Sequence, residues 1–186
     1  MKLFNSKKQN KGFTLVEILL VVGFIALAGI GIYTIYAKVQ VSNQANTESR
    51  NLDTLRAGIK SLYGGSPNFG SVSNVVVNNA RLTPDSMRTA LTAGDAGITN
   101  TFGGAVVVAP ITLGTGTGAN NGFSITYPAV PGAVCSKLVS SAGVQFNQVA
   151  VGSTTVKTFG SNVPIDLVAM STSCAVDTVS ITFSSL

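Results

Sequence analysis

The strongest constraint in this sequence is a run of twenty residues, 18–37, without a charged residue or a proline. A helix rises about 1.5 Å per residue, so this run is long enough to cross a hydrocarbon core of about 30 Å. No water-facing element of a small domain is apolar on all sides over such a length. We therefore expect a membrane-spanning helix near the start of the chain.

Basic residues are concentrated before this run. Four lysines precede it, at Lys2, Lys7, Lys8 and Lys11, whereas only Lys38 follows closely. The positive-inside rule then places residues 1–12 in the cytoplasm and the chain after about residue 40 on the opposite side of the membrane. Removing these four lysines from the 12 Lys and Arg leaves 8 against 7 Asp and Glu. Such a balanced remainder argues against a nucleic-acid partner.

Glu17 directly precedes the apolar run. A carboxylate costs about 2.5 to 3.5 kcal/mol at the bilayer centre, less near its edge, and often marks a function. The alternatives are an interfacial side chain that reaches the headgroups and a functional carboxylate. A secretory signal peptide cut near Ala26-Leu27-Ala28 is a third alternative, although such a peptide leads from its lysines straight into the apolar stretch.

Residues 11–17, KGFTLVE, together with the apolar run resemble the processing signature of type IV prepilins. The resemblance implies that residues 1–12 are a leader and that a prepilin peptidase cuts between Gly12 and Phe13. It also implies N-methylation of the new Phe13 amine and a role for Glu17 in assembly, through pairing with that amine on a neighbouring subunit. Removing one partner of such a buried pair costs several kcal/mol.

The helical pattern continues past the membrane segment 13–37 into an amphipathic segment, 38–63. Apolar residues recur there at helical spacing, at Ala45, Leu52, Leu55, Ile59 and Leu62. No proline interrupts residues 13–63, and Gly64-Gly65 supplies a stop. This pattern predicts one long helix whose second half offers an apolar stripe to a globular head.

Residues 64–186 carry the signals of a mixed domain. Runs at 105–109, 123–127 and 179–183 predict strands. Helices are expected near 134–141 and from Thr83-Pro84-Asp85, with Thr83 as the N-cap, to about Ala93. The predicted fold class is α+β, with the long N-terminal helix packed on the antiparallel sheet of the head.

Cys135 and Cys174 are the only cysteines. In a head outside the cytoplasm a disulfide is expected, and closing a loop of about 40 residues stabilises a fold by roughly 4 kcal/mol on the entropy model. Two free buried thiols are the alternative. The resemblance to type IV pilins implies that residues 135–174 form the disulfide-bounded, variable region of that family.

Within that family the chain is similar to the type IVb group, which includes the bundle-forming pilins and the thin pilins of conjugative plasmids. The similarity is carried by Leu62-Tyr63-Gly64, by residues 98–104, ITNTFGG, and by the placing of both cysteines. A leader of twelve residues is short for this group, and an N-terminal Phe is typical of the type IVa group.

Catalysis is not expected. The chain has no histidine, which excludes a Ser-His-Asp triad and a histidine-bearing metal site, and its 7 acidic residues form no evident carboxylate pair. Asp166 and Asp177 flank Cys174 and are interpreted as solvated loop positions. No metal and no cofactor are predicted.

The resemblance instead implies a structural subunit, a major pilin. Such a protein resides in the inner membrane with its head in the periplasm, until an assembly machinery polymerises it with its own copies into an extracellular fibre. A minor pilin and a pseudopilin of type II secretion are the alternatives, and the two cysteines favour a pilus over the latter. The sequence does not specify what the fibre binds, whether it retracts, or whether it serves conjugation, adhesion or aggregation.

Overall fold

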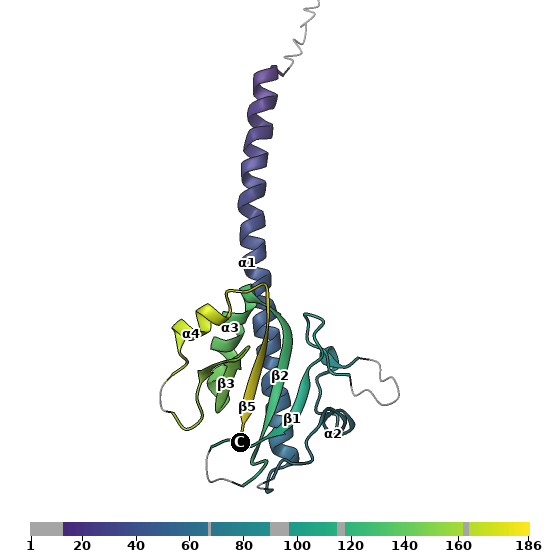
Figure 1. Cartoon of the computed structure of the whole chain (residues 1–186). Helices are drawn as coiled ribbons and strands as arrows, with labels where there is room; N and C mark the ends of the chain where they lie inside the picture. The colour runs from purple at the N-terminus through teal and green to yellow at the C-terminus, as the bar shows by residue number, and fades with distance from the viewer. Residues whose placement is uncertain (1–12, 67, 90–96, 115–117, 162–163) are drawn as a thin grey trace, which may run out of the picture. The chain divides into compact units, whose positions relative to one another are not determined.

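The computed structural model describes residues 13–66, 68–89, 97–114, 118–161 and 164–186 (Figure 1). The predicted leader, residues 1–12, and with it the predicted cleavage position Gly12, lies outside these residues. The chain divides into two compact units, Met1–Gln40 and Val41–Leu186, which we describe separately.

Helix α1 runs from Leu15 to Leu62, which confirms the long predicted helix. Its first part is long and apolar enough to cross a membrane. Every described side chain of this part, from Leu15 to Tyr33, is exposed. A continuous apolar surface of this length is unfavourable in water, so it requires lipid or protein around it.

The part of α1 that belongs to the second unit buries the stripe that its periodicity predicts. Ala45, Leu52, Leu55 and Ile59 are fully buried, but Leu62 is 48% exposed, so the prediction for Leu62 is wrong. Leu62 is the last residue of the helix, and the next residue, Tyr63, packs on the core in its place. The Tyr63 ring lies 5.1 Å from the ring of Phe69.

Within the described residues, five antiparallel strands form one sheet in the order β1-β2-β5-β3-β4. The strands are β1 Val107–Ile111, β2 Gly122–Pro131, β3 Gln148–Val151, β4 Thr154–Lys157 and β5 Thr178–Ser185. The three predicted strands correspond to β1, β2 and β5, with β1 starting two residues later than expected. The β3–β4 hairpin was not predicted, although Gly152-Ser153 between two short β-branched runs is a hairpin signal.

In the part of the chain that the structure describes, three short α-helices accompany the sheet: α2 Asn74–Asn79, α3 Gly132–Ala142 and α4 Leu167–Ser173. Helix α3 confirms the prediction for 134–141. The helix predicted from Asp85 to about Ala93 does not continue past Met87, so that prediction is wrong. Only a short 3-10 helix, Asp85–Met87, forms there, and Arg88 is extended and pairs with Ile98. Thr83 is not the N-cap of this helix either, since Pro84 occupies that position without a side-chain bond. Residues 90–93 lie outside the described residues.

The core of the head forms where the sheet meets α1 and α3 (Figure 1). Alternating residues of the central strands supply its largest side chains, among them Phe123, Ile125, Tyr127, Ile181 and Phe183. Tyr127 and Phe183 meet edge-to-face with ring centroids 6.3 Å apart, an arrangement that aromatic pairs prefer.

The outer edge of the sheet at β1 is closed by a side chain. The Asn74 side-chain amide donates to the Val106 carbonyl at 2.8 Å and its oxygen accepts from the Val108 amide at 2.6 Å. Pro110 removes a further donor from the same strand. Because an open strand edge templates pairing with another chain, Asn74 and Pro110 together protect β1 from unwanted sheet growth.

The contrast between Leu55 and Leu62 gives a stability test on one helix. Leu55→Ala empties a fully buried position and should lower the free energy of unfolding of the head by about 2–5 kcal/mol. Leu62→Ala, the matched control, should cost about 0.5 kcal/mol or less. Denaturant unfolding of the full chain in detergent, followed by circular dichroism, checks both. Equal losses would contradict the packing described here.

Candidate functional site

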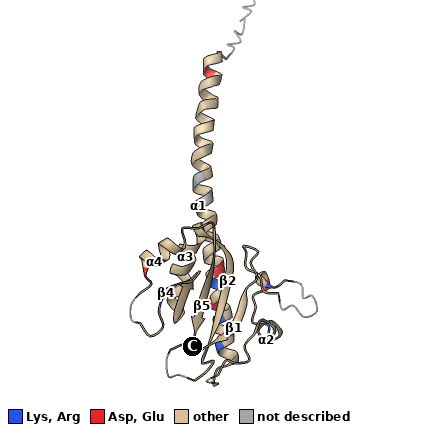
Figure 2. Ribbon diagram, viewed as in Figure 1, with Lys and Arg blue, Asp and Glu red and all other residues tan. Residues whose placement is uncertain are grey.

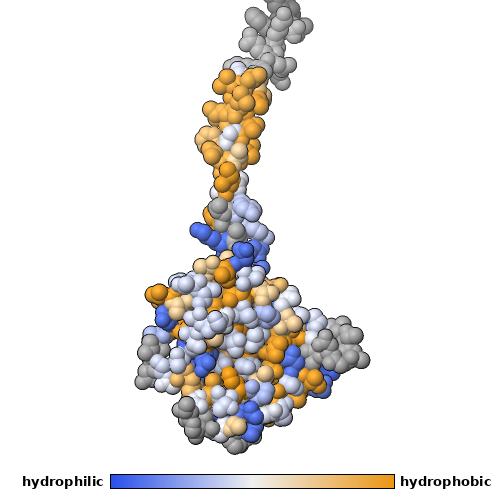
Figure 3. Space-filling model, in the orientation of Figure 1, coloured by the Kyte–Doolittle hydropathy of each residue, from blue (hydrophilic) through white to orange (hydrophobic). Residues whose placement is uncertain are grey.

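The described N-terminal unit begins with Phe13 and carries Glu17 in the first turn of α1. Phe13 is 78% exposed and Glu17 is also exposed. Between Phe13 and Ala37, Glu17 is the only charged residue. The acidic position near the start of α1 is red in Figure 2, and the apolar surface that follows it is orange in Figure 3.

Thr14 caps this helix. Its hydroxyl accepts a hydrogen bond from the Glu17 amide at 3.3 Å, and its carbonyl accepts the first helical bond, from the Ile18 amide, at 3.2 Å. Thr14-x-x-Glu17 is the spacing of a capping box, in which the acidic residue also favours the positive end of the helix dipole. Thr14 is therefore the capping residue of α1, through the backbone amide of Glu17. This cap was not predicted, although the Thr-x-x-Glu spacing was the signal for it.

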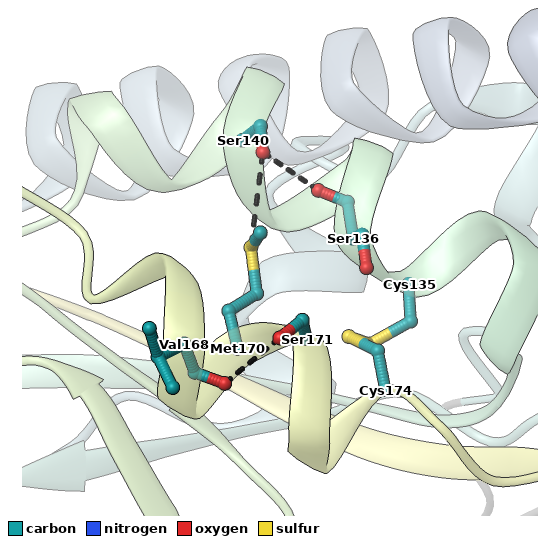
Figure 4. Close-up of a disulfide and its surroundings, with 7 residues drawn as sticks. All are labelled: Cys135, Ser136, Ser140, Val168, Met170, Ser171 and Cys174. Carbon is teal, nitrogen blue, oxygen red and sulfur yellow. Dashed lines mark hydrogen bonds between the residues drawn. A yellow bond between two sulfur atoms is a disulfide. The ribbon is translucent and has the colours of Figure 1, made fainter.

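In the second unit a disulfide joins Cys135 of α3 to Cys174, the residue that follows α4 (Figure 4). The two Cα atoms are 5.6 Å apart and both side chains are buried. This confirms the expected bridge and excludes the alternative of two free thiols. Near the bridge, the Ser140 hydroxyl of α3 contacts the Met170 sulfur of α4 at 3.8 Å (Figure 4).

Polar side chains fix the ends of the helices inside the disulfide-bounded region. Asp166 is the N-cap of α4, and its carboxylate accepts from the amides of Val168 and Ala169, both at 3.0 Å. Asp166 is exposed and lies outside the helix, as expected of a solvated loop position. Its capping role was not predicted. Asp177 is exposed, as expected.

Lys157 of β4 binds the short 3-10 turn Gly143–Gln145, which follows α3. Its ammonium donates to three carbonyl oxygens, those of Gly143 and Val144 at 3.0 Å and that of Phe146 at 2.6 Å. The last carbonyls of a helix lack internal partners and carry partial negative charge, so a cation there is favourable. Partial burial, and to a smaller extent the neighbouring Arg56, lower the pKa of Lys157.

A buried carboxylate, Glu48, links α1 to the segment 98–104. Glu48 is 0% exposed. One of its oxygens accepts from the Thr101 amide at 2.7 Å and the other from the Asn51 side-chain amide at 3.3 Å. A buried carboxylate without such donors would strongly destabilise the fold, so these bonds fix the loop against the helix.

Asn100 organises the loop that Glu48 holds. Its side-chain oxygen accepts from the amides of Phe102 and Gly104 at 3.0 and 2.8 Å, and its nitrogen donates to the Pro128 carbonyl at 2.7 Å. A side chain at Gly104 would overlap that carbonyl oxygen, and Gly103 has a φ of +81°. Residues 99–104, TNTFGG, therefore form a tight turn that is bonded to Glu48 of α1 on one side and to Pro128 of β2 on the other.

Tyr127 of β2 completes this buried polar group. Its hydroxyl donates to the Met87 sulfur at 3.4 Å and lies beside the Glu48 carboxylate. Burial chiefly, and then the Glu48 charge and hydrogen bond, raise the pKa of Tyr127 far above its usual value. Tyr127 therefore stays neutral over the physiological range and remains a donor.

The described residues hold no group of three or more His, Cys, Asp and Glu side chains that could bind a metal ion. The polar clusters found in the head connect backbone segments, and their partners are other groups of the same chain.

We predict that Glu48→Ala lowers the free energy of unfolding by about 2–5 kcal/mol, because it leaves the Thr101 amide unsatisfied and opens a cavity. Glu48→Gln, the matched control, retains an acceptor oxygen and should lose about half as much or less. Hydrogen exchange at the Thr101 amide should accelerate in the alanine variant. An unchanged unfolding midpoint and exchange rate in Glu48→Ala would contradict the anchoring role.

Cys135→Ser should lower the free energy of unfolding by about 2–5 kcal/mol by removing the bridge. Adding a thiol reductant to the native chain should produce the same loss, whereas the double variant Cys135→Ser, Cys174→Ser should be insensitive to reductant. Thermal unfolding of the three samples checks this. If the native chain keeps the same thermal midpoint after the reductant has fully reduced both cysteines, the bridge does not stabilise the head.

Comparison with known proteins identifies relatives of this chain. The family described as PilS N terminal matches residues 42–186. The major structural subunit of bundle-forming pilus from Escherichia coli O127:H6 (strain E2348/69 / EPEC) is 25% identical over 139 residues, which are 75% of this chain and 68% of that protein. The subunit of the same name from Escherichia coli O111:H- matches to the same extent.

Two solved structures share the fold. TcpA, a type IV pilin from Vibrio cholerae El Tor biotype, superposes with a TM-score of 0.56 at 15% identity, covering 79% of this chain and 99% of that one. A type IVb pilin from Salmonella typhi superposes with a TM-score of 0.57 at 23% identity, covering 74% of this chain and 97% of that one. The expected α+β fold with a long N-terminal helix and an antiparallel sheet is thereby confirmed.

Proposed function

Because the chain belongs to the pilin family described as PilS N terminal, we propose that it is the major structural subunit of a type IV pilus of the type IVb group. The relatives from Escherichia coli carry that role in their names. In this proposal the chain polymerises with its own copies and has no catalytic task.

The single observation that supports a polymer most directly is the exposed apolar surface of α1 from Leu15 to Tyr33. Such a surface needs an apolar environment. Before assembly the lipid of the inner membrane supplies it, with the head in the periplasm. After assembly the same helices of neighbouring subunits supply it in the fibre. One surface thus serves both as membrane anchor and as polymerisation contact.

Three steps connect the two states. A prepilin peptidase cuts between Gly12 and Phe13 on the cytoplasmic side, which removes the four lysines that hold the start of the chain there. The new Phe13 amine is methylated. The assembly machinery then moves the subunit out of the bilayer into the growing fibre.

Cutting also creates the partner for Glu17. The new amine at Phe13 carries a positive charge, and the Glu17 carboxylate lies in an otherwise uncharged segment. In an apolar fibre an unpaired charge is costly, whereas a close pair of opposite charges satisfies both groups. The ion pair between the Phe13 amine of one copy and the Glu17 carboxylate of the next therefore favours one axial position of neighbouring subunits. A shift along the fibre axis would leave both charges unpaired.

The cap uses the backbone amide of Glu17 and not its carboxylate, so the pairing role is separable from helix stability. Gln serves as well as Glu at the acidic position of a capping box, so Glu17→Gln keeps the cap and removes the charge. Thr14→Ala does the reverse, because it removes the hydroxyl that accepts from the Glu17 amide. The two variants form a matched set that distinguishes capping from charge pairing.

We expect both Glu17→Gln and Glu17→Ala to be cleaved after Gly12 but to be lost from fibres, with a cost of about 3–5 kcal/mol per unpaired amine. Thr14→Ala should assemble, since a lost cap costs only about 1 kcal/mol. The amount of subunit in sheared fibres, relative to processed subunit in membranes, measures this. If Glu17→Gln assembles normally, the pairing role is wrong; if Thr14→Ala alone fails, capping is the role that matters.

A further inference from the structure

A pocket of about 350 Å³ lies in the head beside the turn that follows α2. Its lining comes from one position of α1, Thr54, and from the segment Arg81, Leu82, Thr83, Pro84, Asp85 and Arg88. Figure 2 shows basic positions on the side of the head that carries α2. The proposed function uses none of these residues.

Arg81 occupies an unfavourable backbone conformation. It has a φ of +55° and directly follows the C-cap of α2, Ala80. The amides of Arg81 and Leu82 donate to the carbonyls of Asn78 and Val77, both at 3.0 Å, which is the pattern of a Schellman motif. Glycine is the usual residue at this position because a side chain destabilises it. A long cation here costs stability, and such strain is concentrated at functional sites.

The Arg81 guanidinium has no partner among the described residues, and Arg81 is exposed. Arg88 uses part of its guanidinium: one nitrogen donates to the Thr83 carbonyl at 3.2 Å and another lies 3.5 Å from the Asp85 carboxylate. Asp85 is almost fully exposed, so this ion pair is weak and readily exchanged. Both arginines therefore have donors available to a ligand.

Two further polar atoms at this pocket lack partners within the described part of the chain. They are the Thr83 hydroxyl and the Arg88 Nε. Thr83 is 2% exposed. Both atoms are shielded from water as they stand, and an unsatisfied buried donor destabilises a fold. Thr83 also lines the pocket, so its unpaired hydroxyl lies close to the space in which a ligand would bind.

From this arrangement we propose that the pocket between Thr54 and the segment 81–88 binds a compact oxyanion, through the guanidinium groups of Arg81 and Arg88 and the hydroxyl of Thr83. Guanidinium forks match phosphate and carboxylate groups, and charge-assisted bonds to them are the strong ones. The Asp85 carboxylate opposes the anion and leaves Arg88 when it binds. The negative charge of Asp85 limits the affinity of the pocket for an anion. Among the described residues, the Arg88–Asp85 ion pair is the one that binding breaks.

Inorganic phosphate is the probe, titrated into the ¹⁵N-labelled full chain in detergent micelles at constant ionic strength, with sodium chloride as the balancing salt. The amide signals of residues 81–88 should shift saturably, with a dissociation constant in the millimolar range. A parallel titration with sodium acetate distinguishes a tetrahedral oxyanion from a carboxylate as the preferred class. Preference for acetate assigns the site to carboxylates, such as acidic side chains, and preference for phosphate assigns it to phosphate groups.

Arg81→Gly separates ligand binding from structure. It relieves the strained backbone and should raise the melting temperature by about 2–4 °C, yet weaken phosphate binding about tenfold. Arg88→Gln and Thr83→Val should also weaken binding while the head stays folded. Lys137→Gln, which removes one exposed cation from α3, is the matched control and should bind as the native chain does. No saturable shift in the native chain up to about 50 mM phosphate, or equal binding by Arg81→Gly and the native chain, overturns the proposal.

Discussion

Everything in this protein depends on the need to cover the apolar surface of α1. In the first unit the helix exposes all described side chains from Leu15 to Tyr33 and carries one charge, Glu17. In the second unit the same helix buries Leu52, Leu55 and Ile59 under the sheet. One half of the helix is thus covered by the chain itself, and the other half depends on an apolar environment from outside, which in the proposed function is lipid first and other copies afterwards.

The head supplies a rigid body on the covered half. Helix α1 contacts the sheet through side chains and forms no strand pairing with it. The loop 98–104, which lies between α1 and the sheet, is therefore held by side-chain hydrogen bonds. Glu48 and Asn100 accept these bonds from backbone amides, and the disulfide Cys135–Cys174 fixes α3 and the end of α4 at the other side of the sheet. Asn74 bonds the backbone of the edge strand β1, which prevents another copy from adding a strand to the sheet there.

The sequence predicts the periodic features of this fold and misses those that depend on distant partners. The bounds of α1, the disulfide and strands β1, β2 and β5 follow from apolar runs, spacing and composition. Glu48 gives no such signal, because a charged residue on an amphipathic helix is expected in water and its partner, Thr101, lies 53 residues away. Helices α2 and α4 are too short for periodicity, and only their caps, Ser73 and Asp166, mark them.

The central claim, that a processed apolar helix serves first in the membrane and then in a fibre, is tested most directly by mass spectrometry of the subunit purified from native surface fibres. The account predicts a chain that begins at Phe13, carries one methyl group on its new amine, and is lighter by two hydrogens for the bridge between Cys135 and Cys174. A subunit that still begins at Met1, or one found only as soluble monomer trimmed near Ala28, would contradict it.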